Sequence, residues 1–205
     1  MNTRAKLKAE SRNRILQAAA TRLRVEGLGG AGIAAVMQDA GLTHGAFYAH
    51  FANKSALSAA ALRHALLENR ARWLGDLRPE SWTQRLQRLA QRYLTTKHRD
   101  NPAEGCALAA LATEAARSDD TFRAAFEVEL LKSIQGICNG RNKETVPPDR
   151  QVEEAIAFMA LCVGGLSLSR AVADKHLSSR ILQATAEAAA RIASNEPKIE
   201  TGQEG

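Results

Sequence analysis

Between residues 33 and 51, two short apolar patterns of helical period lie on either side of a tight turn. The first pattern places its apolar residues three and four positions apart: Ile33, Val36, Met37 and Ala40. This spacing puts them on one face of a short helix. Phe47 and Phe51 share a face of a second helix in the same way. Residues 41–43 between them, Gly-Leu-Thr, have the length of a helix-turn-helix connection, with Thr43 as the expected N-cap.

The rest of the 205-residue chain also favours helices. Its long stretches of Ala, Leu, Arg, Glu and Gln contain few β-branched runs and no alternating strand pattern. We therefore expect an all-α protein of nine helices. The first predicted helix begins at about Thr3 or at Glu10 and ends at Glu26. Besides 33–40 and the short helix after Thr43, the other predicted helices cover about 53–77, 81–98, 102–117, 119–138, 149–174 and 178–194.

We expect two folded parts and a tail. Residues 1–55 form a helix-turn-helix domain, residues 56–195 form a larger helical body, and residues 196–205 form a disordered tail. The stretch 139–148 is polar and ends in Pro-Pro, which predicts an exposed loop within the body.

The positive charge of the chain is confined to its first third. The net charge is +6. Residues 1–64 contain nine Lys or Arg and three Asp or Glu, whereas the remainder contains 19 of each. A basic segment joined to a neutral body indicates an anion-binding module, and nucleic acid is the commonest large anion. By charge alone, a solvated basic arm is an equally good interpretation.

The second short helix is expected to be buried through its apolar side, so its polar residues remain at the surface, where they can contact a DNA duplex. Gly45 allows the backbone to approach closely, and His44 is the best-placed long polar side chain for a base edge. Thr43 and Tyr48 can donate from their hydroxyl groups to phosphate, and Lys54 can pair with it. These contacts predict double-stranded DNA as the partner.

The same residues carry a resemblance to a known family. The stretch "ILQAAATRLRVEG…IAAVMQDAGLTHGAFYAHFANKSAL" resembles the N-terminal domain of the TetR/AcrR family of bacterial transcriptional regulators. The resemblance covers about 50 residues. It implies a nine- or ten-helix, Ω-shaped homodimer in which helices one to three bind DNA, the body binds a small-molecule effector, and the last two helices dimerise.

The sequence departs from the family pattern just before the second helix. The family usually has Thr or Ser there, often contacting a phosphate, whereas this chain has Ala31-Gly32. More of the expected phosphate contact therefore falls to Thr43, Tyr48, His50 and Lys54.

Within the body, we expect a ligand site and a dimer interface. The candidate ligand-binding residues are Cys106, Glu114, Phe126, Phe158 and Cys162. The candidate interface residues on the last two helices are Gly165, Leu168, Ile181 and Ala188. The alternative is that both helices are simply central in a monomer, that Glu114 is an exposed helix residue, and that Phe126 and Phe158 are core residues.

Cys106 has two interpretations. Its place at the start of a helix could lower the pKa of its thiol and make it a sensor of oxidants or electrophiles. The alternative is a small buried apolar residue, which is also how we interpret Cys138 and Cys162. Three cysteines so far apart predict neither a disulfide framework nor a metal site.

Other functional classes lack support in the sequence. It contains no nucleophile elbow, phosphate-binding Gly loop or metal motif, so we expect no enzyme and no cofactor. The apolar run 155–173 is short and interrupted by Gly, Ser and Arg170, so we expect no membrane span and a cytoplasmic protein. A protein-binding adaptor would leave the localised charge unexplained. The sequence thus predicts a repressor that binds a palindromic operator as a homodimer and is released by a small molecule, with thiol sensing through Cys106 as the alternative.

Overall fold

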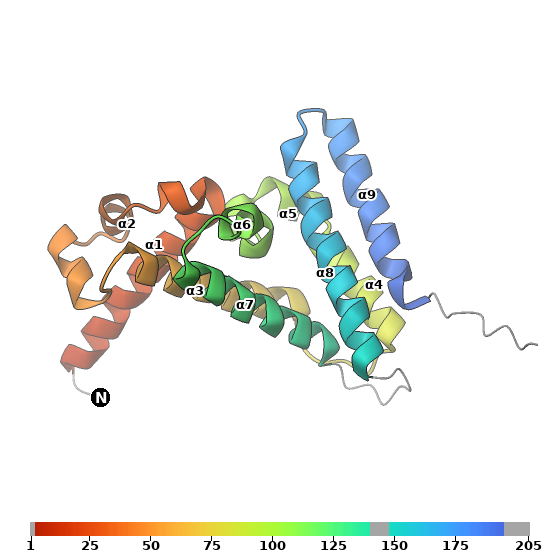
Figure 1. The fold of residues 1–205 in the computed structure, drawn as a ribbon, viewed down its shortest axis with the longest axis horizontal. Helices are drawn as coiled ribbons and strands as arrows, with labels where there is room; N and C mark the ends of the chain where they lie inside the picture. Colours follow the sequence, from red (N-terminus) through yellow and green to blue (C-terminus); the bar gives the residue numbers. More distant parts are fainter. Residues whose placement is uncertain (1–2, 140–147, 195–205) are drawn as a thin grey trace, which may run out of the picture.

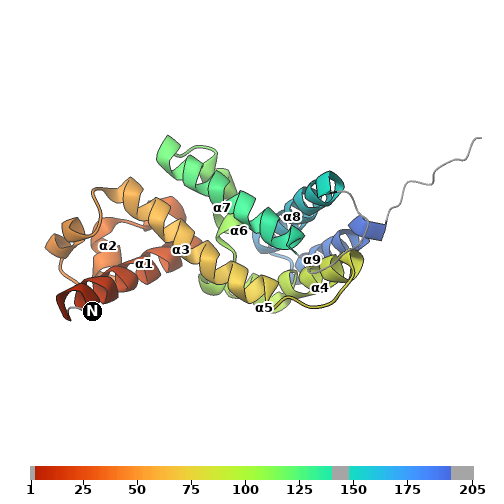
Figure 2. The same cartoon turned by 90° about the horizontal axis from the view of Figure 1, so that it is seen from below.

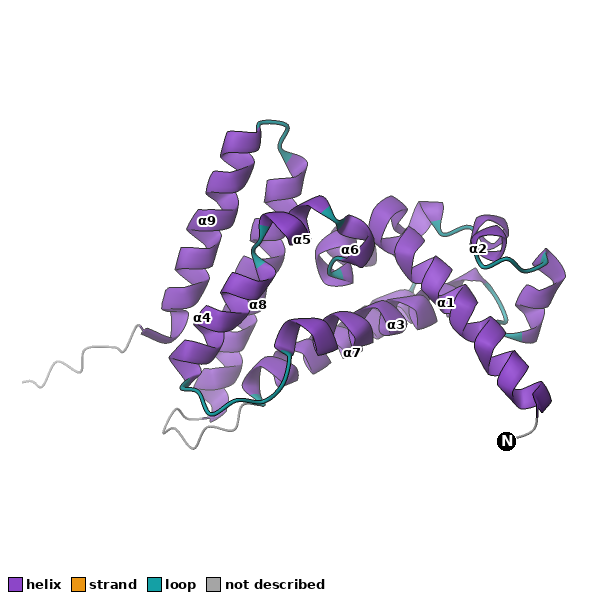
Figure 3. Cartoon of the chain, turned by 180° about the vertical axis from the view of Figure 1, so that it is seen from behind, coloured by secondary structure: helices purple, strands orange, loops and turns teal. Residues whose placement is uncertain are grey.

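Every regular element that the structure describes is a helix (Figure 1, Figure 3). The computed structural model describes residues 3–139 and 148–194. The predicted loop 139–148 and tail 196–205 lie almost wholly outside these ranges. The elements, including three 3₁₀ helices (η), are α1 (Thr3–Gly30), α2 (Ile33–Asp39), η1 (His44–Ala49), α3 (Lys54–Leu74), α4 (Trp82–Tyr93), α5 (Thr96–Asp100), η2 (Pro102–Glu104), α6 (Ala107–Ala115), α7 (Asp120–Cys138), α8 (Pro148–Ala171), α9 (Lys175–Arg191) and η3 (Ile192–Ser194).

The N-terminal elements form the expected helix-turn-helix at one end of the molecule (Figure 1). Val36 and Met37 of α2 and Phe47 of η1 are fully buried. The rings of Phe47 and Phe51 stack with their centroids 5.8 Å apart. Because both aromatic rings point into the core, the opposite side of η1 is left at the surface.

The first helix bends at the residue where the sequence predicts its end. Gly27 has φ 72° and ψ −168°, a conformation that a residue with a Cβ rarely adopts. One further helical turn then follows, so α1 reaches Gly30 rather than ending at Glu26. This bend brings the backbone of Leu28 close to α6.

Two of the predicted helices are each divided in the structure. The segment 81–98 breaks after Tyr93, because Thr95 is extended and its hydroxyl accepts a hydrogen bond from the backbone N–H of His98, which starts α5. The segment 102–117 breaks at Gly105, which is extended and separates η2 from α6. Asn101 occupies the N-cap position of η2, but its side chain makes no cap hydrogen bond.

Helix α3 joins the helix-turn-helix part to the body. It packs against α1 and against α7, and Figure 2 shows it running from one part to the other. The contact with α7 includes a buried ion pair of 2.7 Å between Arg70 and Glu129, whose side chain is 1% exposed. The predicted domain boundary at residue 55 therefore falls in the first turn of a helix that both parts share.

Helices α8 and α9 lie side by side at the opposite end, with α4 packed on α9 (Figures 1 and 2). Among the described residues, α8 is the one helix long and apolar enough to cross a membrane, by length and composition alone. Phe158, Cys162 and Leu166 of α8 are fully buried in the helical body. A core helix of this kind passes the same compositional test, so the test does not identify a membrane span.

Candidate nucleic-acid interface

Three residues of the short helix η1 face solvent together. His44 and Gly45 are exposed, and the Tyr48 side chain is 64% exposed although Phe47 beside it is fully buried. A Cβ placed on Gly45 would meet no atom within 4 Å. The rings of His44 and Tyr48 contact edge to face at 6.1 Å between centroids. The outward presentation predicted for these residues is therefore confirmed.

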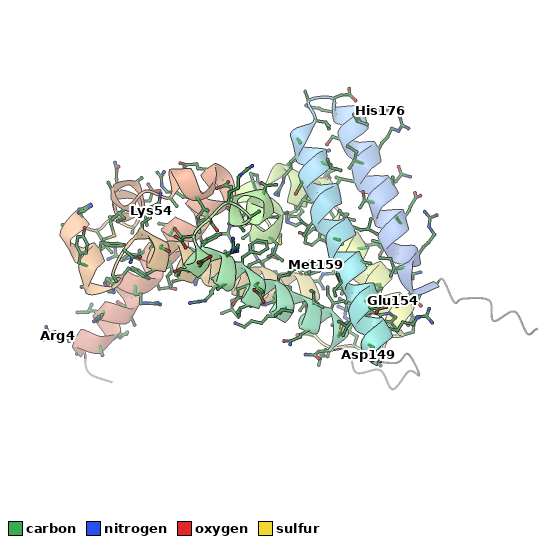
Figure 4. All side chains as sticks on the ribbon, viewed as in Figure 1. Arg4, Lys54, Asp149, Glu154, Met159 and His176 are labelled. Carbon is green, nitrogen blue, oxygen red and sulfur yellow. The ribbon has the colours of Figure 1, made fainter. Side chains whose placement is uncertain are left out.

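The flanks of this surface are suited to phosphate. Thr43 is extended and occupies the N-cap position of η1, as predicted, although its side chain makes no cap hydrogen bond. Lys54 is exposed at the first residue of α3, whose cap is Asn53, accepting from the Ala56 N–H at 2.8 Å. Figure 4 shows Lys54 on the helix-turn-helix part of the molecule.

His50 lies against α1 rather than beside His44. Its ring is half-buried, and Nε2 is 3.0 Å from the Ser11 hydroxyl group. Burial, with Lys8 and Arg12 nearby, lowers the pKa of His50 below its ordinary value. The structure thus gives His50 a contact that holds η1 to α1, which the sequence did not indicate.

Helix α2 is tied to α1 by Arg22. Its Nε lies 2.6 Å from Asp39 Oδ2, and its Nη1 reaches Glu26 and the Gly30 carbonyl. At the other end of α2, Gly32 occupies the N-cap position without a side-chain cap, and Ala31 is buried. The departure from the family pattern at Ala31-Gly32 therefore leaves α2 without a side-chain cap.

The sequence of this part matches a known family. The model of "Bacterial regulatory proteins, tetR family" matches residues 15–61, which cover the helix-turn-helix, the second half of α1 and the first eight residues of α3. The chain carries the DNA-binding domain of the TetR family. It is therefore a DNA-binding transcriptional regulator, and the surface formed by His44, Gly45 and Tyr48 lies on its helix-turn-helix.

Solved structures of TetR-family regulators share the fold over nearly the whole chain. A regulator from Cytophaga hutchinsonii has a TM-score of 0.69 and 21% identity, and the match covers 93% of this chain and 97% of that one. One from Chloroflexus aurantiacus J-10-FL has a TM-score of 0.67 and 22% identity over 93% and 98% of the two chains. One from Rhodococcus sp. has a TM-score of 0.64 and 21% identity over 88% and 99%. No curated protein matches the sequence.

The body of the protein contains an apolar cavity of about 210 Å³ between α6, α7 and α8, which is open to the surface where Ile156 is 49% exposed. Figure 4 shows Met159 on the side of α8 that faces this region. The lining residues are Leu108, Ala112, Phe126, Leu130, Ile134, Ile156, Met159, Ala160 and Val163. Among the described residues, no cluster of three or more His, Cys, Asp or Glu side chains could hold a metal ion.

Of the five candidate ligand-binding residues, only Phe126 lines this cavity. Phe158 is buried on another side of α8, where its ring lies parallel to Trp73 with centroids 6.3 Å apart. Glu114 accepts a hydrogen bond from the Leu28 N–H at 2.6 Å and so contacts α1. The sequence missed the aliphatic lining residues because they have the same residue types as the core.

The cysteines are packed as apolar residues. Cys106 is 2% exposed at the N-cap position of α6, and its backbone N–H donates to His98 Nε2 at 3.0 Å. Cys162 is fully buried, and burial raises the pKa of its thiol well above the ordinary value. Burial also raises the pKa of Cys138. Reactive cysteines are partly exposed, so the burial of Cys106 does not favour the thiol-sensor alternative.

The candidate interface residues differ in exposure. Leu168 is 59% exposed, and Ile181 and Ala188 are partly exposed on α9. Gly165 is buried instead, and a Cβ there would lie 2.5 Å from Thr185 Cγ2. Gly165 therefore permits the close packing of α8 on α9 within one chain, and it presents no surface to a second copy.

Proposed function

We propose that the protein is a repressor that binds a palindromic operator as a homodimer and leaves it when a small apolar molecule binds the body. The observation that carries this proposal concerns α6. Leu108 and Ala112 on this nine-residue helix line the apolar cavity, and Glu114 on the same helix bonds to Leu28 at the bend of α1. A ligand that displaces α6 would therefore act directly on the helix-turn-helix part.

The chemistry of the cavity indicates the class of effector. All nine lining side chains are apolar, so a charged or strongly polar ligand would lose its hydration without gaining partners. A volume of about 210 Å³ lies below the usual range for drug-sized ligands and suits a small hydrophobic molecule. Such a ligand shifts the equilibrium between the DNA-bound and released conformations by no more than the difference in its binding free energy for the two.

An exposed apolar face on α8 and α9 supports dimerisation. Leu168 is 59% exposed and Leu177 is 44% exposed, while Ile181 and Ala188 are partly covered. A Cβ on Gly164 would meet no atom within 4 Å, so a second copy could approach α8 closely there. In a twofold dimer, two η1 surfaces would have to lie about 34–36 Å apart to enter successive major grooves.

The DNA-binding part of this proposal is tested with the intergenic DNA that lies upstream of the gene encoding this protein. We expect the full chain to shift this fragment at low salt and to protect two half-sites related by twofold symmetry in a footprint. A folded dimer that fails to retard the fragment at low salt would refute the operator proposal.

The effector part is tested with a cavity-filling variant. In Ala112→Phe, the new ring occupies the cavity, and in the control Ala124→Phe it points to solvent from α7. Small hydrophobic compounds that release the wild-type protein from DNA should release A124F equally and A112F at least tenfold less effectively. Equal release of A112F and A124F would show that the effector binds elsewhere.

A further inference from the structure

Helix α1 extends well beyond the segment that matches the family. The match begins at Ile15, whereas α1 begins at Thr3. At 1.5 Å per residue, the twelve residues 3–14 extend the helix by roughly 18 Å. All of them are exposed except the half-buried Ser11. They include five Lys or Arg and one Glu, so this extension is among the most basic parts of the chain.

The basic residues of the extension are sorted by face. Arg4, Lys8 and Arg12 follow one another at intervals of four and form a single stripe, which we call the basic stripe. Lys6 and Glu10 are also four apart and lie on roughly the opposite side of the helix. The basic stripe therefore contains no acidic residue, and the one Glu of the extension sits beside Lys6.

Contacts place the basic stripe beside the C-terminal end of η1, on the side of η1 that faces α1. The Arg12 guanidinium lies 5.2 Å from the centroid of the Phe51 ring. Ser11 between Lys8 and Arg12 contacts His50 at 3.0 Å. Lys8 and Arg12 are close enough to lower the pKa of His50, which follows η1 directly. Figures 1 and 2 show the free end of α1 beside η1, and Figure 4 shows Arg4 at that end.

We propose that the basic stripe binds the phosphate backbone of the duplex beside the groove that η1 enters. Exposed basic side chains along one helix face create a positive potential that attracts a row of phosphates. Contacts of this kind set affinity and register but carry no sequence information. The inference rests on the proposed operator binding by η1 and adds a second, sequence-independent contact surface.

The chain offers a matched pair of variants for the test. Lys8→Gln and Lys6→Gln remove the same charge from the same helix two residues apart, but only Lys8 belongs to the basic stripe. We expect K8Q to weaken binding to the operator and to a scrambled duplex by the same factor. The slope of log affinity against log salt should fall by about 1.8, which is two phosphate contacts at about 0.9 each, because the proposed homodimer contains two copies of Lys8. K6Q should keep the wild-type slope, and Arg4→Gln/Lys8→Gln should lose about twice as much as K8Q.

A titration of His50 by NMR checks the geometry independently of DNA. Removal of the Lys8 charge should raise the pKa of His50, and K6Q should leave it unchanged. Equal salt slopes for wild type, K8Q and K6Q, in a wild type that still prefers its operator, would overturn the basic-stripe proposal alone. A wild type that binds operator and scrambled duplexes equally would instead overturn operator recognition by η1.

Discussion

Glu114 on α6 and Leu28 on α1 are joined by a hydrogen bond of 2.6 Å between a carboxylate oxygen and a backbone N–H, although 86 residues separate them in the sequence. The bond lies at the bend of α1, directly after Gly27. It links α6, one of the three helices that line the apolar cavity, to α1, which packs against the helix-turn-helix. The pair is therefore one direct link between the two parts of the molecule, in addition to the shared helix α3.

Removal of the carboxylate should weaken this coupling. Glu114→Ala leaves the Leu28 N–H without its acceptor, and loss of a hydrogen bond to a charged group costs about 1–3 kcal/mol in the free energy of unfolding. Urea denaturation measures the change. The control Glu127→Ala removes an exposed carboxylate from α7 and should change stability by less than about 0.5 kcal/mol. A loss in E114A no larger than in E127A would show that the bond contributes little.

Gly27 and Gly29 should respond oppositely to alanine. Gly27 has φ 72°, and a Cβ there would lie 2.2 Å from Glu114 Oε1, so Gly27→Ala should destabilise the protein by more than about 1 kcal/mol. Gly29 has open space around its Cβ position, and Gly29→Ala should be neutral or stabilise by up to about 1 kcal/mol. Thermal denaturation measures the stability of both variants. A G27A variant as stable as G29A would contradict the bend at Gly27.

A hydroxyl group at position 32 should restore a missing cap. Gly32 is extended at φ −66° and ψ 144°, which suits an N-cap residue, and nothing lies within 4 Å of its Cβ position. Gly32→Ser should therefore stabilise the fold by a few tenths of a kcal/mol, up to about 1. The comparison with Gly32→Ala separates the capping bond from the loss of backbone freedom. A less stable G32S than G32A would argue against a cap at this position.

Neighbouring aromatic residues of η1 should separate stability from DNA binding. Phe47 is fully buried, so Phe47→Ala should destabilise the protein by about 3–5 kcal/mol. Tyr48 is 64% exposed, so Tyr48→Ala should leave the unfolding midpoint nearly unchanged but reduce affinity for the operator at least fivefold. Circular dichroism and fluorescence anisotropy on the same samples measure both effects. A Y48A variant with wild-type affinity would exclude Tyr48 from the interface.

Stability should fall in mild acid because of His98. Its Nδ1–H donates to the Tyr93 carbonyl at 2.7 Å, and its Nε2 accepts from the Cys106 N–H at 3.0 Å, so the folded protein holds the ring neutral. Burial, assisted by the charges of Arg170 and Arg72, lowers the pKa of His98. The unfolded chain therefore binds the proton first as the pH falls through about 6.5, and folding loses at most about 1.4 kcal/mol per pH unit below that value.

Urea unfolding at pH 7.5 and 5.5 measures this loss for three proteins. His98→Gln should show a smaller pH dependence than wild type, since the group that titrates is gone. His176→Gln, at an exposed position on α9, should show the same dependence as wild type. An unchanged pH dependence in H98Q would assign the loss to other groups, with His50 the next to test.

The sequence predicts features that depend on neighbouring residues and misses those that depend on helix packing. The spacing of Phe47 and Phe51 alone indicates which side of η1 is buried, and the structure agrees. The break at Thr95 is missed because a Thr inside a helical pattern is tolerated until its hydroxyl caps the next helix. The cavity forms only when α6, α7 and α8 pack together, and the Glu114–Leu28 bond forms only when α6 packs on α1. No local sequence pattern predicts either feature.

The most direct test of the account is a comparison of affinities at one fixed salt concentration. A duplex selected by the wild-type protein from a random pool is compared with its scrambled counterpart, for wild type and for His44→Ala. We predict that wild type prefers the selected duplex by about a thousandfold or more, and that H44A loses about tenfold of this preference while binding the scrambled duplex as wild type does. Equal affinity of the wild-type protein for both duplexes, or an undiminished preference in H44A, would contradict the claim that η1 presents His44 to DNA.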